Sequence, residues 1–194
     1  PGRTPWRPAC GALQPRGRRS RRRSPRAPAG RTLCLAEGGG RNAVYLASRG
    51  HRVTAVDQSL VGLEKARQFA QERYVRIETV HTDLAHFRIF PRSWDVIVSI
   101  FAHVPPPLRR VIHREAVAGL RPGGVFVLEA YTPEQLKYKT GGPPVEEMMM
   151  TLETLKAELA GLTWLHAKEL VREVTEGELH HGKGAVVQLI GRKP

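Results

Sequence analysis

The sequence predicts an α/β fold, a doubly wound, mostly parallel sheet of seven strands that ends in a C-terminal antiparallel hairpin. Five short apolar or β-branched runs alternate with segments that have the composition of helices. A strand, a helix and a second strand in succession form a right-handed crossover, which makes the two strands parallel. The last two strand-like runs have only a turn between them, so they must be antiparallel neighbours.

The first half of the predicted domain contains three strands and two helices. The strands occupy residues 31–36, 51–57 and 75–83, and the helices occupy residues 41–50 and 60–73. Gly50 is placed to end the first helix, because glycine readily adopts the left-handed conformation that follows many helices. Ser59 is a suitable N-cap for the second helix, whose apolar residues recur on one face.

The second half contains the other four strands and two helices. The strands occupy residues 94–102, 125–131, 163–174 and 184–193, and the helices occupy residues 107–119 and about 150–161. The strand at 94–102 is apolar almost throughout, as expected for a strand that is buried on both faces. Pro107 is tolerated because it lies in the first turn of its helix. Residues 121–124, RPGG, predict a tight turn before the fifth strand.

The net charge of +13 comes mainly from a basic leader. Residues 1–32 contain ten arginines and no acid, whereas the remaining residues carry 21 basic and 18 acidic side chains, a balance of +3. We expect residues 1–30 to be a disordered Arg/Pro-rich leader or non-native sequence, and residues 31–194 to form the domain. The alternatives for the leader are a tail that binds nucleic acid and a transit peptide. Nucleic acid is not an expected partner of the domain.

Composition argues against a membrane protein and against a metalloprotein. No apolar run approaches the roughly 18 residues of a membrane-spanning helix. Cys10 and Cys34 form no CxxC pair. The adjacent His180 and His181 would point to opposite faces of a strand, so they cannot easily bind one metal ion together. We expect a cytoplasmic protein without a metal.

A glycine turn follows the first strand. Gly38, Gly40 and Ala43 satisfy the pattern G-x-G-x-x-G/A, and Asp57 follows Gly38 by 19 residues. Glycines let the backbone approach a ligand, and an acid after the second strand can accept hydrogen bonds from two ribose hydroxyls. These features suit a dinucleotide and another adenosine cofactor about equally. A turn that only packs a helix against a strand could also contain them.

Three other features favour a cofactor with a cationic amino-acid end. Glu37 directly precedes the glycines, where its carboxylate would repel a pyrophosphate and attract an ammonium group. Asp83 follows the third strand and could accept a hydrogen bond from an adenine amino group, although it could instead cap the next turn. The C-terminal hairpin leaves no separate substrate domain of the kind a dehydrogenase has.

This arrangement resembles a class I S-adenosylmethionine-dependent methyltransferase, with a Rossmann-like sheet, over residues 31–194. The family's five successive motifs are similar to LCLAEGGGRN, VTAVDQS, HTDL, WDVIVSIFAH and LRPGGVFVLEAY. The GRN segment is most similar to the tellurite-resistance and thiopurine-type small-molecule branch. The resemblance implies S-adenosylmethionine as cofactor, with Asp57 on its ribose and Asp83 beside its adenine. The implied cofactor site comprises Glu37, Gly38, Gly40, Asn42, Asp57, Gln58, Asp83, Leu84 and Phe101.

Two residues depart from the family's first motif. Cys34 stands where the family usually has Asp, and Ala36 stands where it usually has Gly. Glu37 is expected to take over part of the role of the missing acid. The branch usually has a helical segment ahead of the first strand, and the arginine-rich leader occupies that place here.

We expect the protein to transfer a methyl group from S-adenosylmethionine to a small-molecule acceptor. An activated methyl group needs mainly a positioned nucleophile, with a general base only where the acceptor is protonated. His103 and Tyr131 are the candidate catalytic residues, although His103 could instead be a structural histidine. Arg109 and Arg110 could attract an anionic acceptor, but we expect them to be exposed and solvated on their helix. The alternatives are an NAD-dependent oxidoreductase and a non-catalytic or RNA-associated protein with the same fold.

Overall fold

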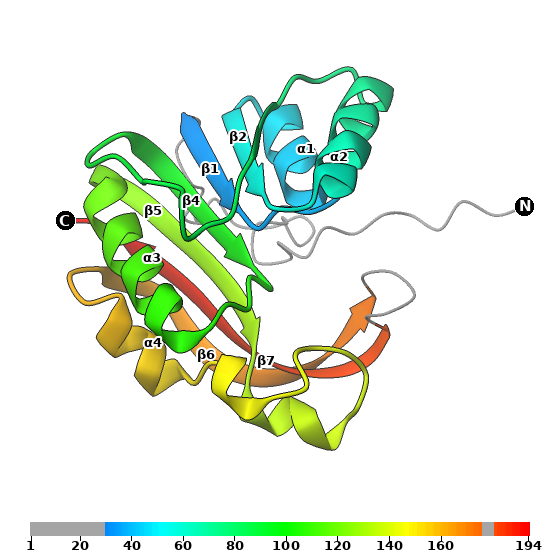
Figure 1. The fold of residues 1–194 in the computed structure, drawn as a ribbon. Helices are drawn as coiled ribbons and strands as arrows, with labels where there is room; N and C mark the ends of the chain where they lie inside the picture. The colour runs from blue at the N-terminus through cyan, green and yellow to red at the C-terminus, as the bar shows by residue number, and fades with distance from the viewer. Residues whose placement is uncertain (1–29, 176–180) are drawn as a thin grey trace, which may run out of the picture.

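A computed structural model describes residues 30–175 and 181–194, which form a seven-stranded sheet with helices on both faces (Figure 1). The strand order is β3-β2-β1-β4-β5-β7-β6, and the predicted fold class is confirmed. The strands are β1 (Arg31–Leu35), β2 (Arg52–Asp57), β3 (Glu78–His81), β4 (Trp94–Ile100), β5 (Leu120–Tyr131), β6 (Thr163–Thr175) and β7 (His181–Arg192).

Parallel pairing joins the first five strands. β1 pairs with β2 on one side and with β4 on the other, while β3 and β5 extend the sheet outward from these pairs. The chain therefore moves outward from β1 to β3, returns to the centre, and moves outward again through β4 and β5. The direction of winding reverses between β1 and β4. Sheets of this type bind ligands outside the carboxyl ends of the two strands at such a reversal.

The predicted C-terminal hairpin is also confirmed. β7 is antiparallel to both of its neighbours, β5 and β6, so it lies inside the sheet and β6 forms the edge. The pairing of β6 with β7 runs from Thr163 opposite Arg192 to Thr175 opposite His181.

The helices divide between the two faces of the sheet. α1 (Arg41–Ser48) and α2 (Leu60–Glu72) contact each other on one face, whereas α3 (Pro106–Gly119) and α4 (Leu152–Glu158) lie on the other (Figure 1). Right-handed crossovers require this division, because the chain moves across the sheet in opposite directions before and after β4. Two short 3₁₀ helices, η2 (Pro133–Lys137) and η3 (Glu146–Met148), connect β5 to α4.

The sheet has an apolar core on each face. Leu33, Ile97 and Phe126 are buried among residues of α3 and α4, whereas Cys34 and Val98 pack with residues of α1. Neighbouring residues of β1 therefore point into different cores, which explains why the central parallel strands are apolar without alternation.

The observed elements differ from the predicted ones mainly at their ends. β3 is limited to four residues, Glu78–His81, because it is the edge strand and its side chains are only partly covered. β5 begins at Leu120 rather than 125, and the predicted turn at 121–124 lies within it as an irregularity in its pairing with β4. Ser59 does cap α2, since its hydroxyl accepts a hydrogen bond from the Gly62 N–H at 3.0 Å.

Two predictions lie outside the described residues. These are the disordered leader, of which residues 1–29 are not described, and the arrangement of His180 beside His181. Within residues 30–175 and 181–194, no helix is long and apolar enough to cross a membrane.

Candidate functional site

The glycine turn after β1 has a backbone that favours residues without a side chain. Gly38 and Gly40 have φ angles of +59° and +84°, in the left-handed region. A Cβ on Gly38 or Gly39 would meet no atom within 4 Å, whereas a Cβ on Gly40 would lie 2.6 Å from the Cβ of Ala66 in α2. The turn therefore leaves open space at Gly38 and Gly39, while Gly40 allows α1 to pack closely against α2.

Ala36 is strained in the same turn. Its φ angle is +49°, a conformation that costs a residue with a side chain on the order of 1 kcal/mol. This is the position at which the resembled family usually has glycine, so the backbone bend is retained here without the residue that adopts it most easily.

Glu37 is buried at the start of α1. It is 9% exposed, and its Oε1 accepts hydrogen bonds from the backbone N–H groups of Asn42 and Ala43, both at 2.8 Å. Burial raises the pKa of Glu37 to about 7, despite these hydrogen bonds and one from the Cys34 thiol, which act in the opposite direction. The side chains of Cys34 and Glu37 are thus in contact, as expected if Glu37 replaces the acid that the resembled family has at the position of Cys34.

Asp57 connects the end of β2 to the glycine turn. Its Oδ2 accepts a hydrogen bond from the Gly38 N–H and its Oδ1 accepts one from the Ser59 N–H, both at 2.7 Å. Each carboxylate oxygen can accept a second hydrogen bond. The structure therefore places Asp57 in direct contact with the glycine turn, and its binding role stays a prediction. The neighbouring Gln58 is exposed at the same edge of the sheet.

Asp83 lies just beyond β3 and caps a turn. Its Oδ1 accepts a hydrogen bond from the Ala85 N–H at 2.8 Å, and the side chain remains exposed. The capping role that the sequence left open is thus present, and it leaves the other carboxylate oxygen available to a ligand.

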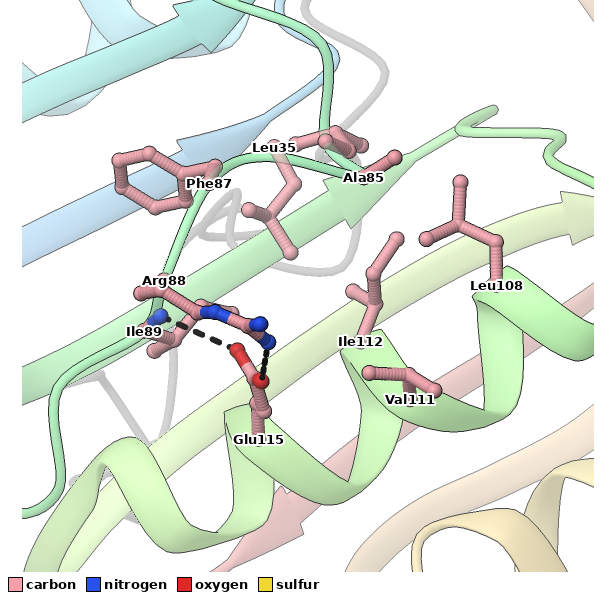
Figure 2. A pocket seen from close by; sticks show the side chains of 10 residues that line it. Leu35, Ala85, Phe87, Arg88, Ile89, Leu108, Val111, Ile112 and Glu115 are labelled. Carbon is pink, nitrogen blue, oxygen red and sulfur yellow. Dashed lines mark hydrogen bonds and ion pairs between the residues drawn. The ribbon is translucent and has the colours of Figure 1, made fainter.

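An apolar pocket lies beside Leu84, between the loop that follows Asp83 and helix α3 (Figure 2). Leu35 at the end of β1 and Leu108 and Ile112 of α3 line it. Arg88 and Glu115 form an ion pair of 3.0 Å across one side. Sequence reasoning identified Leu84 but not the two α3 residues. Their spacing of four indicates a shared helix face, but nothing local indicates that this face borders the site.

Aromatic rings gather at the carboxyl ends of β4 and β5. The ring centroids of Phe101 and Tyr131 are 4.6 Å apart, and those of His103 and Tyr131 are 5.7 Å apart with nearly parallel planes. Phe101 has a φ angle of +52°, and its N–H donates to the Glu129 carbonyl at 2.7 Å. The structure therefore brings together the two predicted catalytic candidates and the predicted cofactor-site residue Phe101.

His103 is held in one tautomer by the backbone. Its Nδ1 lies 2.9 Å from the Met148 carbonyl, which can only accept, so Nδ1 carries the proton. Its Nε2 accepts a hydrogen bond from the Tyr131 N–H at 3.3 Å. This arrangement supports a positioning role for His103 in joining β4, β5 and the segment that contains η3.

The prediction that Arg109 is exposed is wrong. Its side chain is 5% exposed, and its Nη2 forms an ion pair of 2.9 Å with Glu158 of α4. His113 contacts the same carboxylate through Nδ1 at 2.7 Å. Burial by itself would raise the pKa of Glu158, but hydrogen bonds and charge from His113 and Arg109 lower it to about 2. Arg110, in contrast, is exposed as predicted.

The candidate site therefore lies at the winding reversal between β1 and β4. Asp83, Asp57, the glycine turn and Phe101 lie at or just beyond the carboxyl ends of β3, β2, β1 and β4, which are neighbours in the sheet in that order. Among the described residues, no group of three or more His, Cys, Asp or Glu side chains could hold a metal ion.

A match to a known protein family covers most of this site. Residues 33–124 match a methyltransferase domain. The matched region extends from β1 to the start of β5, and so includes the glycine turn, Asp57, Asp83 and the aromatic residues after β4.

One relative of similar sequence is itself described as a methyltransferase. The chain is 31% identical over 111 residues to an uncharacterized methyltransferase, YbaJ, of Bacillus subtilis. The match covers 57% of this chain and 44% of YbaJ, so the chain matches less than half the length of that relative.

Solved structures share the fold at low sequence identity. TehB of Haemophilus influenzae has a TM-score of 0.68 and 20% identity, over 84% of this chain and 57% of TehB. The N-methyltransferase NodS of Bradyrhizobium japonicum, in complex with S-adenosyl-L-homocysteine, has a TM-score of 0.64 and 18% identity, over 85% and 78% of the two chains. These likenesses show the Rossmann-like methyltransferase fold.

The residues present fit a cofactor of this kind. Open space lies over Gly38 and Gly39, and Asp57 retains acceptor capacity beside them. The Oδ1 of Asn42, at the start of α1, is buried and accepts no hydrogen bond within the described part of the chain. An adenosine ligand with a hydrogen-bond donor at one end would satisfy these groups.

Proposed function

We propose that this chain is an enzyme that transfers a methyl group from S-adenosylmethionine to a small-molecule acceptor. One observation carries the choice of cofactor: the Glu37 carboxylate occupies the first N–H groups of α1. A dinucleotide site needs those N–H groups for a pyrophosphate. A carboxylate at the same place disfavours a phosphate and favours a cationic group.

The binding roles follow the positions of the side chains. Asp57 would accept hydrogen bonds from the ribose hydroxyls, with Gln58 beside it, and the open side of Gly38 would allow close approach of the ligand. Asp83 and Leu84 would border the adenine, next to the apolar pocket lined by Leu35 (Figure 2). Glu37 and Asn42 would face the amino-acid end.

The methyl acceptor would approach the aromatic cluster at the ends of β4 and β5. When bound, S-adenosylmethionine supplies a methyl group that is already activated by a sulfonium, so the protein needs chiefly to orient the acceptor. Phe101 and Tyr131 offer apolar surface for this, and His103 holds the surrounding backbone in place. The GRN segment after the glycines supports placing the protein in the tellurite-resistance and thiopurine-type branch.

The proposal is tested by measuring dissociation constants for S-adenosylhomocysteine and NAD⁺ by isothermal titration calorimetry. We expect S-adenosylhomocysteine to bind and NAD⁺ not to bind. Asp57→Asn should weaken S-adenosylhomocysteine by about tenfold or more, because it removes a charged hydrogen-bond acceptor.

Asp95→Asn is the matched control for Asp57→Asn. Asp95 also accepts a hydrogen bond from a backbone N–H, that of Arg31 at 2.7 Å, but it lies at the amino end of β4, away from the site. It should leave the dissociation constant of S-adenosylhomocysteine unchanged. Binding of NAD⁺ in preference to S-adenosylhomocysteine would overturn the proposal.

A further inference from the structure

Three consecutive backbone carbonyls beside the aromatic cluster accept hydrogen bonds from side chains. They belong to Glu147, Met148 and Met149, in and just after η3 (Figure 1). Arg109 Nη1 donates to the first and the third, at 3.5 and 3.3 Å. His103 Nδ1 donates to the carbonyl between them, at 2.9 Å. The segment that leads into α4 is therefore held by the chain between β4 and the first turn of α3.

The guanidinium of Arg109 divides its donors between two partners. Its Nε donates to Glu158 Oε2 at 3.0 Å and its Nη2 donates to Oε1 at 2.9 Å, which attaches α3 to α4. His113 of α3 contacts the same carboxylate through Nδ1 at 2.7 Å. The attachment of the two helices therefore uses only part of the Arg109 side chain, and Nη1 acts on residues 147–149 instead.

The Met148 carbonyl determines the tautomer of His103. Because this carbonyl can only accept, Nδ1 carries the proton and Nε2 accepts a hydrogen bond from the Tyr131 N–H at 3.3 Å. The ring centroids of His103 and Tyr131 are 5.7 Å apart, in the cluster that the proposed function assigns to the methyl acceptor. A displacement of residues 147–149 would therefore change the tautomer and the orientation of a ring beside the acceptor.

We infer that Arg109 is a positioning residue for the methyl-acceptor site: it fixes the carbonyls on either side of Met148 and so keeps His103 in the Nδ1–H tautomer. This inference rests on the proposed function, which places the acceptor at the aromatic cluster. A residue that only joined α3 to α4 would need no more than a positive charge opposite Glu158, which lysine also supplies. The simultaneous contacts with a carboxylate and two carbonyls require the planar fork of arginine.

The test compares the wild type with Arg109→Lys by nitrogen-15 NMR of the histidine rings. Lysine keeps a charge beside Glu158, but its single ammonium group cannot also reach both carbonyls. The Met150 N–H donates to the Tyr131 carbonyl at 3.0 Å, and this bond keeps the segment attached to β5 in the variant. The ring signals of His103 are assigned by their absence from His103→Gln. We expect one tautomer in the wild type and a mixture of both tautomers in Arg109→Lys.

A second reporter is provided by the methionines. The chain contains three, and all of them lie in this segment: Met148, Met149 and Met150. Their ε-methyl carbon-13 signals should therefore all report on its position. Arg109→Lys should shift the signals of Met148 and Met149 more than that of Met150, whose N–H remains bonded to β5.

Two further variants control the test. Arg110→Lys makes the same substitution at the adjacent residue, which is exposed, and should alter neither spectrum. Arg109→Met combined with Glu158→Met removes both buried charges together, which proteins often tolerate. The double variant keeps the test valid if Arg109→Lys does not fold, and it should show the same loss of the single His103 tautomer.

Binding of S-adenosylhomocysteine to the same proteins, measured by isothermal titration calorimetry, separates this inference from the proposed function. Arg109→Lys should leave the dissociation constant unchanged, because the residues assigned to the cofactor lie at the ends of other strands. If His103 keeps one tautomer in both Arg109 variants, or loses it in Arg110→Lys as well, the positioning role is overturned and the proposed function stands. If the wild type does not bind S-adenosylhomocysteine, the proposed function fails, and the histidine spectra still decide whether Arg109 positions His103.

Discussion

Glu37 and Glu158 are both buried acids, but their surroundings differ in one respect. The Glu37 carboxylate, in the turn after β1, is held by two backbone N–H groups and a thiol, and its pKa is raised to about 7. The Glu158 side chain is 7% exposed, and Arg109 and His113 of α3 contact it. Its pKa is lowered to about 2.

Burial alone does not decide whether the pKa of an acid is raised or lowered. Desolvation acts on both residues in the same direction, and a cationic partner reverses its effect only at Glu158. The cluster around Glu158 joins α3 to α4 and is complete within the chain. Among the residues that the structure describes, Glu37 has no ion-pair partner and only the charge of Arg41 acts on it through space, which is the condition expected of a group that meets a cationic ligand.

The largest expected effect comes from breaking the complete cluster. Glu158→Gln leaves the guanidinium of Arg109 buried without its counter-charge, which should lower the free energy of unfolding by about 3–5 kcal/mol. Urea denaturation measures this change. Glu153→Gln, on the exposed side of α4, is the control and should change it by less than about 1 kcal/mol. Equal effects of the two variants would show that the cluster does not hold α3 against α4.

The pH dependence of stability should have opposite signs at the two acids. At Glu37 the folded pKa of about 7 exceeds the ordinary 4.5, so the folded protein keeps a proton that the unfolded chain releases. The free energy of unfolding should therefore fall as pH rises from about 4.5 to 7, by up to about 3 kcal/mol. At Glu158 stabilisation is present above pH 4.5 and is lost as pH falls toward 2.

Denaturation curves collected from pH 3 to 9, about one pH unit apart, measure both slopes. Glu37→Gln should remove the decline between pH 4.5 and 7 and leave the loss of stability in acid unchanged. If the decline persists in this variant, another group carries the proton, and the contrast between the two acids is lost.

Substitutions at Gly39 and Gly40 test which part of the glycine turn is open and which part is packed against α2. Gly40→Ala should lower the free energy of unfolding by about 1–3 kcal/mol, because its Cβ would lie 2.6 Å from Ala66 and its φ angle is +84°. Gly39→Ala has open space around its Cβ and should change stability by less than about 0.5 kcal/mol. Thermal unfolding distinguishes them. A destabilised Gly39→Ala would mean that the space over the turn is filled.

The smallest expected effect concerns the thiol beside Glu37. Cys34→Ala removes a hydrogen bond that lowers the pKa of Glu37, so the midpoint of its pH dependence should rise by roughly a few tenths of a pH unit. Cys34→Ser retains a donor and should not shift the midpoint upward. The same denaturation series measures both variants, and identical midpoints for alanine and serine would exclude a contribution from the thiol.

The amino-acid sequence by itself determined the succession of strands and helices along the chain, the C-terminal hairpin and the spacing between the glycine turn and Asp57. These features depend on local periodicity, on the handedness of crossovers and on a spacing of 19 residues, all of which are visible along the chain. The length of β3 was not predictable, because an edge strand is defined by the neighbour it lacks.

Only the tertiary structure decided which charged side chains are buried and what they contact. Arg109 and Arg110 are adjacent, yet one is buried against Glu158 and the other is exposed. Glu158 lies 45 residues from His113 and 49 from Arg109, so no local pattern connects them. The Asn42 Oδ1 likewise became visible as a buried acceptor without a donor among residues 30–175 and 181–194 only in three dimensions, because hydrogen-bond partners depend on the space around an atom.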